Sequence, residues 1–315
     1  MSVISPDKIS LSSDPIGKGL TAYIYVGKLH GHQVAVKQFI RHSVAFDNEL
    51  SLLKTLKHEN IIKFLGYYKS PKQRYLVLEL LLEGDMATYI ANNKPNDWRV
   101  LSQLNAQIID GMSYLHKHKI VHADLKYENI LLNRDKIIKI SDFGNSYRVR
   151  KPIVRSKIVT GTHYFLAPEV ANGWKAVYES DVWSFGCMLY YVTTGYPPYS
   201  NISHKALFNL LQVDEPILLQ PTSLSGHNIP PSFLKIAEAC LNWRLDQRPS
   251  FETMKIFLQS GNWRDNVGAK TKLGGSIVVL RPAMGSAPRK NGQKSKKSKK
   301  SKKSKKSKKS KKRKI

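Results

Sequence analysis

The hydrophobic pattern of this chain changes its period near Gly84, and this change limits the folds that the chain can adopt. Before Gly84, alternating and β-branched residues predict three antiparallel strands within 9–39 and two further strands over 64–68 and 75–82. Apolar residues at helical spacing predict one helix over 45–56. The first part of the chain is therefore expected to be a small sheet that carries one helix.

After Gly84 the apolar residues follow a helical period. The clearest stripe consists of Leu101, Leu104, Ile108, Met112 and Leu115. Further helical runs lie near 182–192, 207–211 and 233–241. The two patterns together predict an α+β protein with a small antiparallel β-sheet part and a larger, mainly α-helical part. A hydrophobic share of 41% in 315 residues is enough to build a core without covalent cross-links.

The two cysteines, Cys187 and Cys240, fit no metal-binding or redox spacing, so we expect buried, unpaired thiols. Such thiols are typical of a reducing compartment. The N-terminus lacks an apolar signal region, and no stretch approaches the roughly 18 consecutive apolar residues that a membrane helix requires. We expect no transmembrane segment and an intracellular protein that is cytoplasmic, nuclear or both.

A glycine-bearing turn between two strands is the first candidate for phosphate binding. It comprises Ile16, Gly17, Lys18, Gly19, Leu20, Thr21, Ala22, Tyr23 and Ile24. Glycines let backbone N–H groups approach the phosphates of ATP, although such a turn alone is more typical of an ordinary hairpin. Lys37, which ends the strand that contains Ala35, is placed to hold the α and β phosphates, and Glu49 in the next helix can form an ion pair with it.

A second motif places a carboxylate, an ammonium group and an amide on one short loop, in the run Val121-His122-Ala123-Asp124-Leu125-Lys126-Tyr127-Glu128-Asn129. Asp124 would accept or orient the proton of a substrate hydroxyl, and Lys126 would neutralise charge on the transferring phosphoryl group. Asn129 would coordinate Mg²⁺. Asp142, in the run Asp142-Phe143-Gly144, would supply a second, hard oxygen ligand for Mg²⁺.

These motifs, in this order, resemble those of eukaryotic protein kinases, and the resemblance extends over about 9–258. It implies a bilobal protein kinase fold that uses ATP and Mg²⁺ and transfers the γ-phosphate to Ser or Thr hydroxyls of protein substrates. Lys126 and the pair Gly161-Thr162 resemble Ser/Thr kinases rather than tyrosine kinases. The stretch 240–251 is similar to the tyrosine-kinase-like branch of the family.

The resemblance also implies roles for residues outside the two motifs. Ile24, Ala35 and Leu131 would enclose the adenine, Leu78 would be the gatekeeper, and the hinge from Glu79 to Leu81 would hydrogen-bond the base. Leu53, Phe64, His122 and Phe143 would stack as the regulatory spine. Ala167-Pro168-Glu169 would close the activation segment, Glu169 would pair with Arg248, and the run that begins at Asp181 would brace the catalytic loop.

Two departures from the family pattern bear on regulation. Ala123 replaces the Arg that usually collects a phosphate from the activation segment, so activity is expected without phosphorylation at Ser156 or Thr160. Ala22 replaces the third glycine of the turn but leaves its backbone donors in place. The alternative reading is a pseudokinase or scaffold that binds ATP and polyanions without efficient catalysis. A third hypothesis is a nucleic-acid-binding protein that carries the kinase fold passively.

The formal net charge of +28 is concentrated at the end of the chain. The last 27 residues, 289–315, hold 17 Lys or Arg and no acid, and subtracting them leaves +11 for 1–288. The Ser-Lys-Lys repeat predicts a disordered tail. It would bind nucleic acid or another polyanion, serve nuclear import, or remain a neutral solvated tail. The expected segments are a leader (1–9), a kinase domain (10–260, with an N-lobe over 10–83 and a C-lobe over 84–260), a linker (261–293) and the tail (294–315).

Overall fold

The computed structural model describes residues 2–40, 44–93, 97–149, 163–200, 203–211 and 229–259. The linker and the repeat tail lie outside these residues and stay predictions. The same holds for Ser156, Thr160 and the pair Gly161-Thr162.

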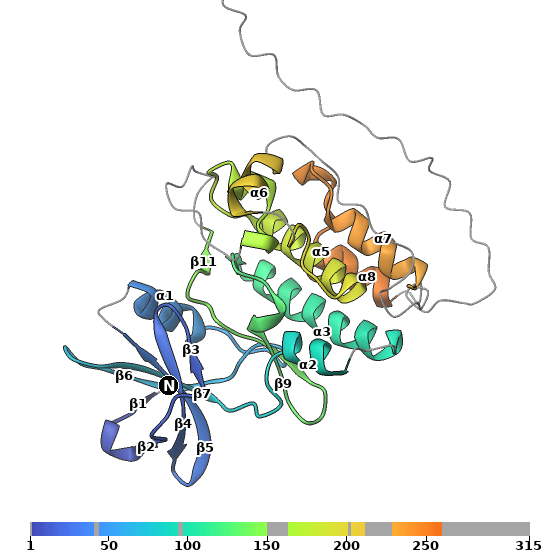
Figure 1. The fold of residues 1–315 in the computed structure, drawn as a ribbon. Helices are drawn as coiled ribbons and strands as arrows, with labels where there is room; N and C mark the ends of the chain where they lie inside the picture. Colours follow the sequence, from blue (N-terminus) through green and yellow to red (C-terminus); the bar gives the residue numbers. More distant parts are fainter. Residues whose placement is uncertain are drawn as a thin grey trace, which may run out of the picture. The chain divides into compact units, whose positions relative to one another are not determined.

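A seven-stranded sheet forms the N-terminal lobe within the described residues (Figure 1). Its strands are β1 (Ser2–Val3), β2 (Ile9–Leu11), β3 (Gly17–Lys18), β4 (Ala22–Leu29), β5 (His32–Phe39), β6 (Phe64–Lys69) and β7 (Arg74–Glu79). The order is β1-β6-β7-β5-β4-β2, and β3 pairs with β4. Every pair is antiparallel except β1 with β6. The predicted small sheet is confirmed, although its first strand is divided into two short strands, β2 and β3.

The α-helix that the structure describes in this lobe, α1 (Val44–Leu53), lies beside the sheet (Figure 1). Phe46, Leu50 and Leu53 are buried at helical spacing, as the pattern predicts. The helix ends at Leu53 instead of Leu56, because the chain turns where the Thr55 amide donates to the Leu52 carbonyl. Leu56 remains buried beyond this turn.

The second lobe is mainly helical within the described ranges, as predicted. Its helices are α2 (Met86–Asn93), α3 (Trp98–Lys117), α4 (Pro168–Ala171), α5 (Tyr178–Thr194), α6 (His204–Leu210), α7 (Pro231–Cys240) and α8 (Phe251–Gln259). Two short antiparallel ladders, which the pattern does not predict, join β9 (Ile130–Leu132) to β10 (Ile138–Ile140) and β8 (Ile120–Val121) to β11 (Tyr147–Arg148). Asp97 caps α3 by accepting a hydrogen bond from the Arg99 amide at 2.9 Å. The predicted stripe on α3 is buried throughout.

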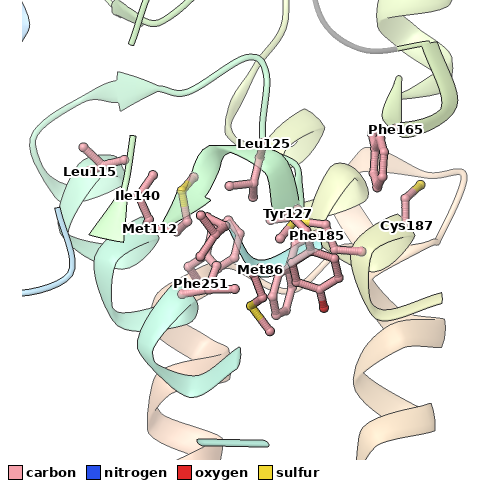
Figure 2. Close-up of a cluster of buried hydrophobic side chains, with 14 of the residues drawn as sticks. Met86, Met112, Leu115, Leu125, Tyr127, Ile140, Phe165, Phe185, Cys187 and Phe251 are labelled. Carbon is pink, nitrogen blue, oxygen red and sulfur yellow. The ribbon is translucent and has the colours of Figure 1, made fainter. Parts of the chain in front are cut away.

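The core of this lobe supports the loop that carries the predicted catalytic residues. Figure 2 shows Leu125 and Tyr127 among buried side chains from α2, α3, α5 and α8. Their exposed fractions are 1% and 0%. Leu125 and Tyr127 thus anchor the loop in the core, whereas Asp124, before them, and Lys126, between them, are only partly buried. None of the helices in the described residues is long and apolar enough to span a bilayer.

Cys187 and Cys240 are both buried and free, which confirms the prediction of unpaired thiols. Burial raises the pKa of each thiol well above its ordinary value. Thiolate is the reactive form of cysteine, so these two groups are packed as small apolar side chains and are not poised for chemistry.

The N-terminal residues, predicted as a leader, take part in the sheet. β1 pairs with β6 at one end of the strand order, while β2 pairs with β4 at the other end. Between them Ile4 is 6% exposed and packs in a second hydrophobic cluster with Val34, Val36, Tyr75 and Val77. Along β7, Leu76 and Leu78 instead join the main core, because successive side chains of a strand point to opposite faces. The N-terminal segment therefore covers the sheet face opposite the main core.

We predict that Ile4→Ala will destabilise the protein while Val3→Ala will change its stability little. Ile4 is buried, whereas the neighbouring Val3 is 64% exposed. Truncating a buried Ile to Ala costs about 2–5 kcal/mol, because it removes apolar contacts and leaves a cavity. Urea unfolding of the two variants measures the difference. Equal shifts in the unfolding midpoint would show that the N-terminal segment does not brace the sheet.

Candidate active site

Two carboxylates from separate elements contact the ammonium group of Lys37. Lys37 lies on β5, Glu49 lies on α1, and Asp142 follows β10. The Nζ atom of Lys37 is 2.9 and 2.8 Å from the two carboxylate oxygens of Glu49 and 2.8 Å from Oδ1 of Asp142. The expected ion pair of Lys37 with Glu49 is therefore present. The contact with Asp142 joins both lobes at this point.

Burial and charge act against each other in this cluster. Burial disfavours the charge on Lys37, but the carboxylates of Glu49 and Asp142 outweigh it and raise the pKa of the ammonium group. Burial raises the pKa of Glu49; Lys37 opposes this shift and Asp142 adds to it. For Asp142 burial acts to raise the pKa, yet Lys37 prevails and lowers it. Lys37 stays positive and Asp142 stays negative near neutral pH.

The second group of predicted residues lies on the loop that follows β8. The side-chain amide of Asn129 donates to the Asp124 carbonyl at 2.7 Å, and Nζ of Lys126 lies 3.4 Å from Oδ2 of Asp124. Asn129 ends a short 3-10 helix, Tyr127–Asn129, whose Tyr127 is anchored in the core. The loop thus brings the carboxylate, the ammonium group and the amide together, as the motif suggests.

The backbone of this loop is strained and is held by Asp181 of α5. Ala123 has a φ of 63°, in the left-handed region that a residue with a Cβ rarely adopts. One carboxylate oxygen of Asp181 accepts the Ala123 amide and the other accepts the His122 amide, both at 2.9 Å. Nε2 of His116 lies 2.9 Å from the latter oxygen. This is the brace that the resemblance implies, and such support is what keeps a strained conformation populated.

The expected spine residues share the main core. Leu53, Phe64, His122 and Phe143 are all buried there or packed within it. The rings of His122 and Phe143 lie 5.4 Å apart, and Nε2 of His122 is 3.0 Å from the Ser141 carbonyl oxygen. Because Phe143 is buried next to the catalytic loop, the preceding Asp142 is turned toward Lys37.

The glycine-bearing turn is closed by a hydrogen bond from the Gly19 amide to the Ala22 carbonyl at 2.8 Å. Ala22, which replaces the third glycine, is 3% exposed and packs in the main core. Its methyl group is therefore not at the surface of the turn. Leu20, at the tip, is fully exposed, and Ile16 is also exposed. These two residues, predicted to contact the nucleotide, are thus exposed and are not packed against the other predicted site residues.

Two of the remaining predicted nucleotide contacts, Ile24 and Ala35, lie on the neighbouring strands β4 and β5. Ile24 pairs with Lys37 across β4 and β5, and Ala35 pairs with Leu78 across β5 and β7. Leu81 and Leu131 are partly buried against the main core, and Lys18 lies with its Nζ 5.6 Å from the centre of the Tyr23 ring. Thr21 accepts the Ile40 amide through its carbonyl.

The side chain of Glu79 is already engaged by the protein. Its Oε1 accepts the Lys63 amide at 2.7 Å and lies 3.5 Å from Nζ of Lys139. The carboxylate thus ties the end of β7 to both lobes. The Glu79 side chain is therefore engaged within the protein, and hydrogen bonding of the base by the backbone of the hinge remains a prediction.

Arg248 forms a two-pronged ion pair with Glu169, as expected. Its NH1 and NH2 atoms donate to the two oxygens of Glu169 at 2.9 and 3.0 Å, and the Arg248 side chain is fully buried. Ser180 of α5 donates to the same carboxylate at 2.6 Å. The pair fixes α4 to α5 and to the segment that precedes α8.

Two residues that the motifs do not identify connect these groups. The side-chain amide of Asn48, next to Glu49 on α1, donates to the Ser146 carbonyl at 2.6 Å. The hydroxyl of Ser146 donates to the His122 carbonyl at 2.9 Å. Asn and Ser are common residue types, so only their position beside Glu49 and shortly after Asp142 could have drawn attention to them.

Comparison with known proteins gives a consistent result. Residues 12–257 match the family described as "Protein kinase domain". The chain is 31% identical over 301 residues to MAP3K epsilon protein kinase 1 of Brassica napus, covering 92% of this chain and 23% of that protein. It is 31% identical over 243 residues to mitogen-activated protein kinase kinase kinase 12 of Rattus norvegicus, covering 77% of this chain and 26% of the relative.

A further relative is serine/threonine-protein kinase PLK4 of Aedes aegypti, which is 31% identical over 252 residues, covering 76% of this chain and 31% of that protein. The chain thus spans between 23% and 31% of the length of these three relatives.

We predict that Arg248→Ala will destabilise the fold strongly and that Arg244→Ala will not. Removing Arg248 leaves Glu169 buried without a counter-charge, and breaking a buried ion pair in this way costs about 3–5 kcal/mol. Arg244 pairs with Asp246 at 3.1 Å on the exposed surface, where solvent screens the interaction. Thermal unfolding of both variants compares the two pairs directly. A similar loss in both would contradict the structural role given to Arg248.

Proposed function

Because the chain belongs to the protein kinase family, we propose that it transfers the γ-phosphate of ATP to Ser or Thr hydroxyls of protein substrates. The observation that carries this proposal is the assembled set of Lys37, Glu49 and Asp142 beside the loop that holds Asp124 and Asn129. The preference for Ser and Thr rests on Lys126 and on the similarity to the serine/threonine-protein kinase of Aedes aegypti.

Each group has a task in the proposed transfer. Asp124 accepts a hydrogen bond from the substrate hydroxyl and takes its proton as the hydroxyl oxygen bonds to the γ-phosphorus. The bond from that phosphorus to the bridging oxygen of ATP breaks in the same step, and ADP leaves. Lys126, 3.4 Å from Asp124, lowers the cost of the negative charge that spreads over the transferring group. Lys37 holds the α and β phosphates, and Glu49 fixes the direction of its ammonium group. The backbone donors of the glycine-bearing turn cover the phosphates.

The donor set suits a divalent cation such as Mg²⁺. Asp142 offers a carboxylate, and Asn129 has its amide nitrogen engaged by Asp124, which leaves the carboxamide oxygen as its ligand. Among the residues that the structure describes, no three His, Cys, Asp or Glu side chains form a metal site. This fits Mg²⁺, which binds through one or two protein oxygens together with phosphate oxygens and water. Bound there, Mg²⁺ would neutralise phosphate charge and align the γ-phosphate.

A small hollow, with room for about one water molecule, lies between Asp124 and Leu125 on one side and the segment of Phe165, Leu166 and Ala167 on the other. The Phe165 carbonyl accepts a hydrogen bond from Ser184 of α5 at 2.8 Å, which fixes this segment to the helical core. A peptide substrate is too large for the hollow and would have to lie outside it, with its hydroxyl next to Asp124. Lys37, Glu49, Asp124, Asn129 and Asp142 are all present. Their presence favours an active kinase over the pseudokinase alternative.

We predict that Asp124→Asn, Lys37→Met and Asp142→Asn will each abolish most phosphoryl transfer. Loss of a general base or of a group that stabilises the transition state costs about 10²- to 10⁴-fold in kcat. Transfer of the γ-phosphate to a generic basic protein with Mg²⁺ and saturating ATP measures this loss. Asp135→Asn, at an exposed residue, is the matched control and should retain activity. Wild-type turnover by Asp124→Asn would remove the proposed role of Asp124.

We also propose that the repeat tail binds polyanions, because its lysines could neutralise phosphates of nucleic acid or of an anionic lipid surface. The tail carries no aromatic residue, which disfavours base stacking and hence recognition of a particular single-stranded sequence. Each phosphate on a serine adds about −1.5 to −2 charges near pH 7. Phosphorylation of several of the six serines in 294–312 would therefore offset a large part of the tail charge.

We predict that removing residues 289–315 will reduce the salt dependence of binding to duplex DNA or heparin. In the counterion-release description, each phosphate contact contributes about −0.9 to the slope of log K against log salt concentration on duplex DNA. The full chain, the truncated chain and a form phosphorylated on the tail serines should give a steep, a shallow and an intermediate slope. An unchanged slope after truncation would place polyanion binding on the kinase domain.

A further inference from the structure

We propose that Asn48 and Ser146 form a hydrogen-bonded link that positions α1, and thereby Glu49, relative to the catalytic loop. The proposal rests on the function proposed above and names two positioning residues for it. Neither residue contacts a predicted substrate group. Both act through the Lys37 and Glu49 pair.

The link connects three elements through short contacts. The Asn48 side-chain nitrogen is 2.6 Å from the Ser146 carbonyl oxygen and 3.4 Å from that of Gly144. Ser146 is fully buried, its amide donates to the Phe143 carbonyl at 3.1 Å, and its hydroxyl donates to the His122 carbonyl at 2.9 Å. A continuous path of hydrogen bonds therefore runs from α1 to the backbone that Asp181 braces.

The orientation of the Asn48 amide follows from its partners. Both atoms that face it are carbonyl oxygens, which accept but cannot donate hydrogen bonds. The nitrogen must point toward them, because the opposite orientation would place oxygen against oxygen. An aspartate at this position could not form the link.

Asn48 and Glu49 are consecutive residues of one helix, so they move together. Glu49 reaches Lys37, which in turn contacts Asp142, while Asn48 reaches Ser146, four residues after Asp142. A helical residue advances the axis by only about 1.5 Å. An outward shift of α1 that breaks the contact of Glu49 with Lys37 would therefore also break that of Asn48 with Ser146. The two contacts stabilise the same position of the helix.

Arg148, which lies further along the segment that follows Asp142, forms a second attachment. Arg148 donates from NH2 to the Thr55 hydroxyl at 3.1 Å and from NH1 to the His118 carbonyl at 2.6 Å. Strand β11, which contains Arg148, pairs with β8. The segment is thus attached to α1 and its C-terminal turn, and to the end of α3, by groups of the protein itself.

This attachment could replace an ordering effect that the chain lacks because it has Ala123. A methyl group cannot bind a phosphate on the activation segment, so phosphorylation lacks one means of ordering that segment. The Asn48 link uses neutral groups and needs no modification. It provides a reason for α1 to keep the position in which Glu49 contacts Lys37.

A double-mutant cycle on the full chain, treated with phosphatase, tests the proposal. We expect Asn48→Ala to lower kcat/KM by about fivefold, the effect of losing one ordinary hydrogen bond, and Asn48→Asp to lower it further. Ser51→Ala is the matched control on α1, because the Ser51 hydroxyl only donates to the Asn48 carbonyl within the helix. In a Glu49→Ala background, Asn48→Ala should cost little more, because the contact of residue 49 with Lys37, through which Asn48 acts, is already lost.

Hydrogen exchange of the α1 amides gives a readout that does not require activity. Asn48→Ala should accelerate exchange in α1, and Ser51→Ala should not. An equal loss of kcat/KM in both backgrounds would overturn the proposal, as would unchanged exchange in α1. If the wild-type chain transfers no phosphate but exchange in α1 responds to Asn48→Ala, the proposed function fails while the positioning link stands.

Discussion

The rest of the site depends on the ammonium group of Lys37, which is shared by two carboxylates. Isolated buried charges are costly, so Lys37 and Glu49, which are both buried, tolerate their positions because each faces an opposite charge. The Asp142 side chain is 47% exposed and adds a second carboxylate to the same ammonium group. Lys37 lies on the sheet, Glu49 lies on α1, and Asp142 lies on the segment after β10. The packing of the hydrophobic cores of both lobes therefore positions the two carboxylates within hydrogen-bonding distance of this ammonium group.

Two strained backbone positions near this cluster are also held in place by neighbouring groups. Asp142 has a φ of 59° and Ala123 has a φ of 63°. Such conformations cost energy and persist where the surroundings determine them. Asp181 holds the strained backbone at Ala123, and Lys37 holds the side chain of Asp142. One of these strained positions is Asp142, a proposed ligand of Mg²⁺, and the other is Ala123, which directly precedes the proposed general base Asp124.

How far the sequence predicts this structure depends on how local each feature is. The stripe on α3 extends over a long helix, so its period is plain, whereas β1 has only two residues and shows no period at all. Asp124, Lys126 and Asn129 lie within one motif and could be identified together. The bond between Asn48 and Ser146 joins residues 98 positions apart. Their contact is a product of the packing of α1 against the second lobe, which no local pattern encodes.

The N-terminal strand has a consequence for how molecules of this protein meet one another. A strand at the edge of a sheet offers unpaired N–H and C=O groups to strands of other molecules. β6 would be such an edge, and at six residues it is long enough to accept a partner strand. β1 pairs with Gly66 and Tyr67 and so covers part of that edge. Residues 2–4 therefore shorten the length of β6 that is open to strand addition by another molecule.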